Sequence, residues 1–343
     1  MTYLIVLLVL TSVYTFYMGF TDGSNAIATT VATRAIDPRL AVVIGAVTQT
    51  ATVLLMFVIS ADLSVAATVG KGIVRSSFFG GLTPAKGFIY LLAALLSAIV
   101  WSAITYVLKQ PNSTSHTLLG GIIGAGIAAF GFKAILWANV FFRIILMIFL
   151  APLVSVLIGF IINRLLKRIA LRAPGGAGKF VKVLQWIHMV TIASAISVND
   201  AQKSIGIYFL IVSLGIASIP ATPPFYLICV FAFSLGLGMI FGGYRIILTI
   251  GRRLFRIKPF MALSSQIATN IVMFGSSFLG IPISTGQVVS SSVVGIGISE
   301  RANGVKWITV RRIVLGWIIT MPATILFGAI FYFLTNVLLG GIL

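Results

Sequence analysis

The chain has 343 residues, of which 59% are hydrophobic and only 8% are Asp, Glu, Lys or Arg. A soluble domain carries roughly 25% charged residues, so this composition excludes a soluble enzyme and a disordered chain. The single cysteine excludes a secreted disulfide scaffold. A net charge of +19 would suggest nucleic-acid binding in a soluble protein, but cytoplasmic loops of membrane proteins also collect Lys and Arg. We therefore predict an all-α polytopic membrane protein that binds no nucleic acid.

Apolar segments follow one another along the whole chain, and most are long enough to cross about 30 Å of hydrocarbon. Residues 1–20 lack a basic stretch and a small-residue cleavage site, so they predict a first membrane helix rather than a cleaved signal peptide. The predicted apolar segments are residues 3–32, 40–59, 88–108, 114–130, 135–162, 183–217, 225–250, 261–279, 284–299 and 313–338.

Four of these segments depart from a simple membrane-spanning helix. The fourth and the ninth are short, rich in Gly and Ser, and follow breaks at Pro111 and Pro282, which predicts re-entrant helical hairpins. The first and the sixth are long but are interrupted by polar stretches at residues 22–25 and 199–203. We expect these two segments to form broken helices.

Three basic clusters determine the predicted orientation in the membrane. The first, residues 164–182, holds six positive charges and no negative one, and the others lie at residues 252–258 and 301–312. Because Lys and Arg favour cytoplasmic loops, we place all three clusters inside, which puts both termini outside. Of the 24 basic residues, 16 then lie in cytoplasmic loops. The loops assigned to the outside hold Lys71, Arg75, Lys86 and Lys133.

The two halves of the chain repeat each other. The stretch from Pro111 to His116 is echoed by the stretch from Pro282 to Gln287, and Asp22 has a counterpart in Asp200. The first half starts outside and the second inside, which predicts inverted-topology repeats with a binding site at the midplane, as in secondary transporters. The predicted parts are an N-terminal repeat at residues 1–163, a basic cytoplasmic linker at 164–182 and a C-terminal repeat at 183–343.

The sequence contains only five acidic residues. Asp37, Asp62 and Glu300 lie in loops or at segment ends, where we expect a solvated or capping role. Asp22 and Asp200 lie inside apolar segments, where a charge costs at least ~2.5 kcal/mol and therefore indicates a functional cavity. The alternative is a buried carboxylate that caps a broken helix or pairs with a nearby lysine.

Hydroxyl residues begin both short segments: Ser113, Thr114 and Ser115 in the first half, and Ser284 and Thr285 in the second. Such side chains cap helices, and the free backbone N–H groups at a helix N-terminus attract anions. Plain N-capping is the alternative. Two related motifs in hairpins that face polar helix stretches favour an anion site.

An anion and two carboxylates in one low-dielectric cavity repel each other, so cations or protons must accompany the anion. Lys203, three residues after Asp200, could neutralise that carboxylate or reach the substrate. The residues alone therefore predict a cation-coupled anion symporter, with carbonyls freed by the broken helices as additional ligands. Oxygen ligands of the kind that Na⁺ takes are offered by Asp22, Asn25, Asn199, Asp200 and Gln202.

Two motifs resemble the duplicated signature of the PiT family of inorganic phosphate transporters. Residues 19–29 are similar to the first copy, G-x-x-D-x-x-N-A-x-x-T, and residues 198–206 are similar to the second, N-D-A-Q-K-x-x-G. The two Pro-x-Ser-Thr hairpins are similar as well. The chain departs from the pattern at residues 195–198, where the family often has S-H-G, and at Gly286 and Gln287, where Thr and His are common.

The resemblance covers nearly the whole chain and implies a short bacterial member of the family in the plasma membrane. It implies symport of inorganic phosphate with Na⁺ or H⁺, an inverted-repeat fold, a homodimer and no further cofactor. It also implies that the hairpin hydroxyls hold phosphate while the Asp, Asn and Gln side chains hold the cations.

Some residues and functions keep alternative interpretations. His116 is either a proton-sensitive site residue or a buried structural histidine, and Thr29, at the end of the first motif, is a candidate substrate contact. The basic linker is either purely topological or a docking site for a cytoplasmic regulator or anionic lipid. Arg143 and Arg245 are expected to pair with polar groups or to mark an interface. The alternative functions are a sulfate or related oxyanion carrier and a passive anion channel; no zinc or Ser–His–Asp motif indicates an enzyme.

Overall fold

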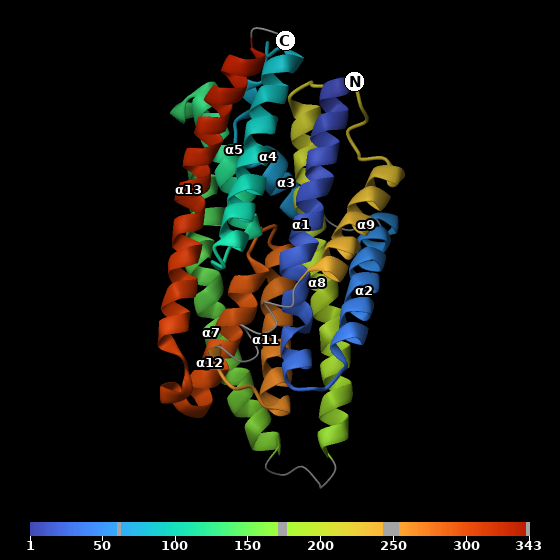
Figure 1. Cartoon of the computed structure of the whole chain (residues 1–343), viewed down its shortest axis with the longest axis vertical. Helices are drawn as coiled ribbons and strands as arrows, with labels where there is room; N and C mark the ends of the chain where they lie inside the picture. The colour runs from blue at the N-terminus through green and yellow to red at the C-terminus, as the bar shows by residue number, and fades with distance from the viewer. Residues whose placement is uncertain (60–62, 171–176, 243–253, 341–343) are drawn as a thin grey trace.

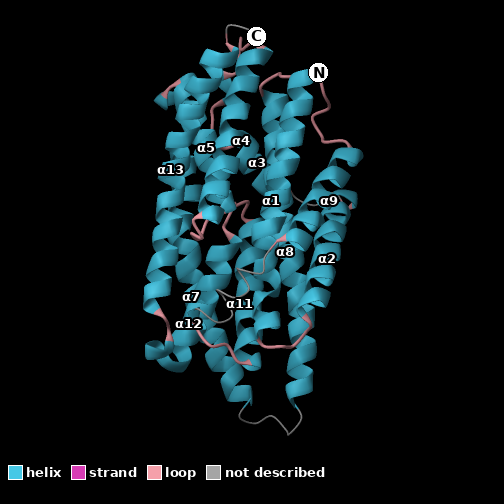
Figure 2. Cartoon of the chain, in the orientation of Figure 1, coloured by secondary structure: helices cyan, strands magenta, loops and turns pink. Residues whose placement is uncertain are grey.

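The computed structural model describes residues 1–59, 63–170, 177–242 and 254–340. Within these ranges the chain is almost entirely helical, and no strand occurs apart from an isolated bridge between Val74 and Ile135 (Figure 2). Six of the helices described there are long and apolar enough to cross a membrane. The predicted all-α polytopic fold is confirmed. Asp62, Arg245, the centre of the basic linker and part of the 252–258 cluster lie outside the described residues.

The helices follow the predicted apolar segments in order, with one addition, the eight-residue α3, which is too short to register as a span. A π-helical turn at Phe141–Ile145 joins α6 to α7. The first half contains α1 (Thr2–Ala32), α2 (Pro38–Val58), α3 (Ser64–Lys71), α4 (Pro84–Val107), α5 (Thr114–Phe130), α6 (Trp137–Val140) and α7 (Leu146–Ala170). The second half contains α8 (Ala177–Ser213), α9 (Phe225–Phe241), α11 (Pro259–Phe278), α12 (Thr285–Arg301) and α13 (Trp307–Leu339).

Two helical hairpins enter the molecule from opposite ends (Figure 1). Helix α4 runs from the end that holds both termini to the middle and α5 returns, whereas α11 and α12 do the same from the other end. Both turns contain a left-handed residue, Lys109 with φ 55° or Gly280 with φ 66°. The next backbone N–H, of Gln110 or Ile281, then bonds back to the last turn of the helix, as in a Schellman motif. The predicted hairpins are confirmed.

The prediction of broken helices is wrong, because α1 and α8 each run without interruption through their polar stretches. Neither residues 22–25 nor residues 199–203 include a proline, so no backbone donor is removed. Some of the polar side chains pair within their own helix, as Asp200 does with Lys203, and others bond to neighbouring elements, as Asp22 does to Thr114. The backbone carbonyls stay in the helical hydrogen-bond ladder, and they are therefore not free to bind a cation.

The two halves of the chain exchange their last helices. Helix α7 packs on the α11–α12 hairpin, and α13 packs on α4 and α5. Both contacts are close because a glycine faces a backbone: a Cβ on Gly124 would lie 1.9 Å from the carbonyl oxygen of Ile325, and one on Gly295 would lie 2.1 Å from that of Val156. Each hairpin is thus held by a helix from the other half of the sequence.

Candidate functional site

The candidate site lies where the turns of both hairpins reach the middle of α1 and α8. The Ser115 hydroxyl donates to the Ile283 carbonyl at 2.7 Å, which joins the start of α5 to the residues just before α12. From α8, the Asn199 amide donates to the Ile281 carbonyl at 3.3 Å. The N-termini of α5 and α12 are therefore close together and face the polar stretches of the two long helices.

Asp22 is the centre of the first half of the site and is 4% exposed. Its carboxylate accepts hydrogen bonds from the Thr114 hydroxyl and, at 3.4 Å, from the Asn25 amide. The Tyr14 hydroxyl donates to the Thr114 carbonyl at 2.5 Å. Thr29 is buried one turn after Asn25. Helix α1 therefore fixes the first residue of α5 through two side chains.

Asp200 and Lys203 form a buried ion pair on α8. The Lys203 ammonium lies 2.5 Å from one Asp200 oxygen, and both side chains are at most 1% exposed. Lys203 thus neutralises Asp200. The ammonium group has further N–H donors, which are available to a substrate. The other Asp200 oxygen and the side-chain oxygen of Asn199 are buried without a protein partner. Leaving such atoms unpaired costs about 1–3 kcal/mol each, so these two oxygens are candidate positions for a ligand.

The two carboxylates act on each other through space. Asp22 and Asp200 lie near enough for their charges to repel, and the Lys203 charge attracts both. His116, buried in the first turn of α5, also lies within range of the Lys203 charge. With both carboxylates ionised, the two carboxylates and one ammonium carry one net negative charge in the centre. Such a charge attracts a cation or a proton and opposes an anion that enters alone.

The hydroxyls at the two hairpin starts differ in their partners. Ser113 accepts the His116 backbone N–H at 3.3 Å, as an N-cap residue does. Ser284 makes no side-chain cap bond, and the Thr285 hydroxyl is buried without a partner. The Gln287 amide nitrogen is also buried without a partner. Plain capping explains Ser113, whereas it leaves the second motif free to bind a ligand.

The Gln202 side-chain oxygen accepts the backbone N–H groups of Val65 and Ala66 at 2.9 and 3.2 Å. This contact caps the start of α3, which packs on α8. The same short helix receives Arg143, whose guanidinium donates to the Thr68 hydroxyl at 3.2 Å, so the expected polar pairing of this arginine is confirmed. The role of Gln202 as a cation ligand stays a prediction, because α3 occupies its oxygen.

Of the acids outside the centre, the two that the structure describes, Asp37 and Glu300, lie at helix ends, as expected. Asp37 caps α2 by accepting two backbone N–H groups. Glu300, near the end of α12, accepts hydrogen bonds of 2.9 Å from both Lys167 and Asn163 of α7. Partial burial opposes ionisation of Glu300, but these hydrogen bonds outweigh it and hold the pKa of the carboxyl below its ordinary value. These acids serve helix ends rather than the candidate site.

The sequence analysis missed four polar residues. Tyr14 positions Thr114 as described above, and the Thr15 and Ser204 hydroxyls lie 2.7 Å apart and link α1 to α8. Gln49 is fully buried with neither side-chain polar atom paired. Helical spacing from the two Asp residues offers a signal for Thr15 and Ser204, which lie seven residues before and four after them. Tyr14 and Gln49 carry no such signal.

The fold and the buried polar centre together define a class of membrane protein. A multi-pass helical protein in which opposed hairpins meet at a buried, charged, partly unpaired centre is a membrane transporter. The sequence profile of the phosphate transporter family matches residues 18–328, and the chain belongs to that family.

Individual relatives agree with this assignment. A probable low-affinity inorganic phosphate transporter of Bacillus subtilis is 35% identical over 330 residues, which cover 95% of each chain. One from Rhizobium meliloti is 33% identical over 326 residues, 93% of this chain and 92% of its own. A solved structure described as the sodium-dependent phosphate transporter superposes with a TM-score of 0.82, over 98% of this chain and 100% of its own, at 20% identity. That likeness establishes the fold.

Proposed function

We propose that this protein carries inorganic phosphate into the cell together with Na⁺, by alternating access to the site between the hairpins. The observation that carries the proposal is that two helix N-termini meet two buried carboxylates. The first feature attracts an anion, the second attracts cations, and at low dielectric each ligand favours binding of the other. The names of the relatives support phosphate as the anion, and the sodium-dependent structural neighbour supports Na⁺.

Phosphate would bind between the first turns of α5 and α12. Backbone N–H groups there supply part of the coordination, and hydroxyls supply the rest. Thr285 is the best-placed hydroxyl because it is buried and unpaired, and the Gln287 amide is a further donor of the same kind. The proposed phosphate ligands are Ser113, Thr114, Ser115, Ser284 and Thr285. The Thr114 and Ser115 hydroxyls would donate to phosphate only if they released Asp22 and the Ile283 carbonyl.

Cations would bind on the α1 and α8 sides of the phosphate. Asp22 with Asn25 offers one set of oxygens, and Asn199 with Asp200 offers another, including two oxygens that have no partner. Lys203 lowers the negative charge of the second set. Gln202 would join it only if its contact with α3 were released.

The inverted-repeat arrangement is part of the same proposal. Hairpins that enter from opposite ends, share one turn geometry and pack through equivalently placed glycines support two related halves, at residues 1–163 and 183–343. The basic linker between them supports a cytoplasmic position for that end and an external position for both termini. Residence in the plasma membrane, the homodimer and a regulator at the linker stay predictions.

The decisive experiment measures uptake of radiolabelled phosphate into proteoliposomes with and without an inward Na⁺ gradient. We expect accumulation that depends on the gradient and is little affected by excess sulfate. Uptake that is indifferent to both Na⁺ and pH would contradict coupling. Equal competition by sulfate would indicate a general oxyanion carrier, and single-channel conductance steps in a planar bilayer would indicate a passive channel.

A further inference from the structure

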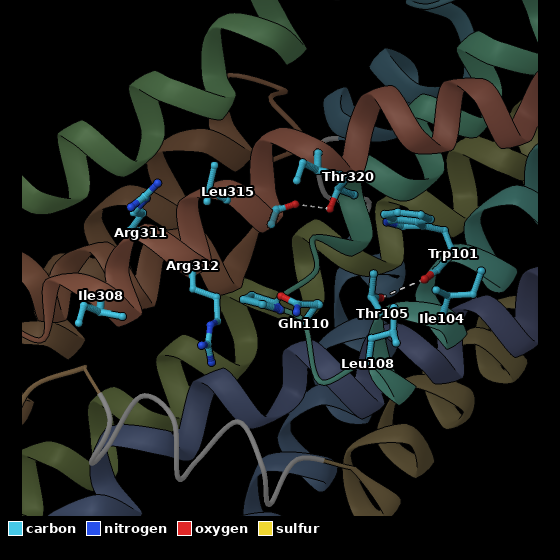
Figure 3. Close-up of a pocket in the computed structure, with 13 residues that line it drawn as sticks. Trp101, Ile104, Thr105, Leu108, Gln110, Ile308, Arg311, Arg312, Leu315 and Thr320 are labelled. Carbon is cyan, nitrogen blue, oxygen red and sulfur yellow. Dashed lines mark hydrogen bonds between the residues drawn. The ribbon is translucent and has the colours of Figure 1, made fainter.

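A cavity, separate from the polar centre, lies beside the turn of the first hairpin (Figure 3). It has a volume of about 400 Å³ and lies between the last turns of α4, the hairpin turn and the first half of α13. Its walls are mainly apolar, with Trp101, Ile104 and Leu108 on one side and Leu315 and Ile319 on the other. Leu108, Leu315 and Ile319 are each at least 46% exposed. The cavity therefore faces the surroundings of the protein along an apolar surface.

Two arginines flank the outer part of this cavity. Arg311 and Arg312 line it on the side of Ile308, toward the beginning of α13, whereas Trp101 and Ile104 lie toward the other end (Figure 3). Both arginines are exposed, and in the described ranges neither has an ion-pair partner. Few carboxylates exist that could pair with these arginines. The sequence has only five acids, and four of them are engaged at the polar centre or at helix ends.

The position along α13 sets the depth of these charges. Arg312 is followed directly by the apolar stretch of α13, so we place the two guanidiniums near the level of the lipid phosphates, on the side proposed to be cytoplasmic. From Arg312 to Thr320 the helix rises about 12 Å, which is the depth range of acyl chains in one leaflet. Cytoplasmic leaflets carry anionic lipids that attract Arg and Lys.

We propose that this cavity is a binding site for one anionic phospholipid of the cytoplasmic leaflet. The lipid phosphate pairs with Arg311 and Arg312, and an acyl chain fills the apolar part toward the hairpin turn. Gln110 and Pro111 of that turn line the same cavity, and the Asn112 side chain next to them accepts a hydrogen bond of 3.5 Å from Thr320. A bound lipid therefore supports the residues that lead into the α5 motif.

The test uses phosphatidylglycerol with a photoreactive diazirine in its acyl chain, mixed into liposomes that contain the full-length protein. We expect cross-links in peptides from α4 (residues 101–108) and α13 (residues 308–320). In R311Q/R312Q the labelling should fall about tenfold or more, because each basic residue near the surface contributes about 1 kcal/mol to binding anionic lipid. The matched control R301Q/K306Q removes the same charge at the end of α12 and just before α13, without touching the cavity lining, and it should label as the wild type does.

A second variant, L315W, fills the apolar part and keeps both arginines, so a loss of labelling there tests the acyl-chain position independently of charge. Equal labelling by the phosphatidylcholine analogue, or equal losses in R301Q/K306Q, would overturn the proposal in favour of unspecific surface attraction. Suppression of labelling by free inorganic phosphate would overturn it in favour of an ion site. Absence of labelling at these residues in the wild-type protein would also overturn the proposal.

Discussion

The two helical hairpins have the same turn and approach the same centre, yet their first turns are satisfied to different degrees. At the start of α5, Ser113 caps the helix and Thr114 donates to Asp22. At the start of α12, the Thr285 hydroxyl and the Gln287 amide are buried without partners. The copy of the motif at α5 therefore mainly joins helices, whereas the copy at α12 leaves its donors free. Similar sequence patterns in the two halves need not contribute equally to ligand binding.

The carboxylates show a related difference. Three residues after Asp22 the chain has Asn25, and three residues after Asp200 it has Lys203. Asp22 receives only neutral donors, whereas Asp200 receives an ammonium at 2.5 Å. The uncompensated negative charge of the centre therefore belongs to the Asp22 side, and we expect the coupling cation to be required most strongly there.

The largest expected effect is that of Asp22→Asn. Removing the uncompensated charge removes the main reason for a cation to bind, so phosphate uptake in proteoliposomes should fall to the level of protein-free vesicles. Because the amide can still accept from Thr114, the thermal transition in detergent should stay near that of the wild type. Asp37→Asn, at an exposed helix cap, is the matched control and should transport normally. Near-normal uptake by Asp22→Asn would refute the cation assignment.

The next effect concerns the ion pair on the α8 side. Lys203→Met leaves Asp200 buried without its partner, which costs about 3–5 kcal/mol of folding free energy. The double variant Asp200→Asn/Lys203→Met should recover most of this loss while staying inactive in transport. Unfolding in detergent, followed for both single variants and the double variant, measures the coupling energy. If the losses were simply additive, the pair would not have the structural role that its geometry indicates.

A smaller effect separates the two hairpin starts. Thr285→Val removes a donor that no protein group uses, so the half-saturation concentration for phosphate should rise about tenfold or more, as for a lost hydrogen bond to a charged group. Ser113→Ala removes a helix cap and should cost about 0.5–2 kcal/mol of stability. Its half-saturation concentration for phosphate should rise less than that of Thr285→Val. Thr335→Val is the control, because that hydroxyl bonds within α13. Equal increases of the half-saturation concentration in Thr285→Val and Ser113→Ala would contradict the unequal contribution of the two hairpins to phosphate binding.

Much of this molecule could be predicted from its sequence, for identifiable reasons. Apolar length and the breaks at Pro111 and Pro282 gave the helices and hairpins because membrane spans and proline impose strong local constraints. The continuity of α1 and α8 could not be predicted, because it depends on partners such as Thr114 that come from distant segments. The same applies to Gln202, whose oxygen is engaged by a short helix that leaves no periodic signal.

The smallest effect tests the outer ends of the hairpins, where, among the described residues, an ion pair holds α12 and none holds α4 or α5. Glu300 accepts from Lys167 and Asn163, and its pKa is held below the ordinary value. A lowered folded-state pKa means that the carboxylate contributes stability above the unfolded pKa, about 4.3, and that this contribution disappears as the pH falls through the folded-state pKa. The melting temperature of Glu300→Gln should therefore lie slightly below that of the wild type at pH 7 and converge with it toward pH 3, whereas uptake at pH 7 should change little. A difference that persisted at pH 3 would mean that Glu300 acts through packing, and the contrast between the outer ends of the two hairpins would then be steric rather than electrostatic.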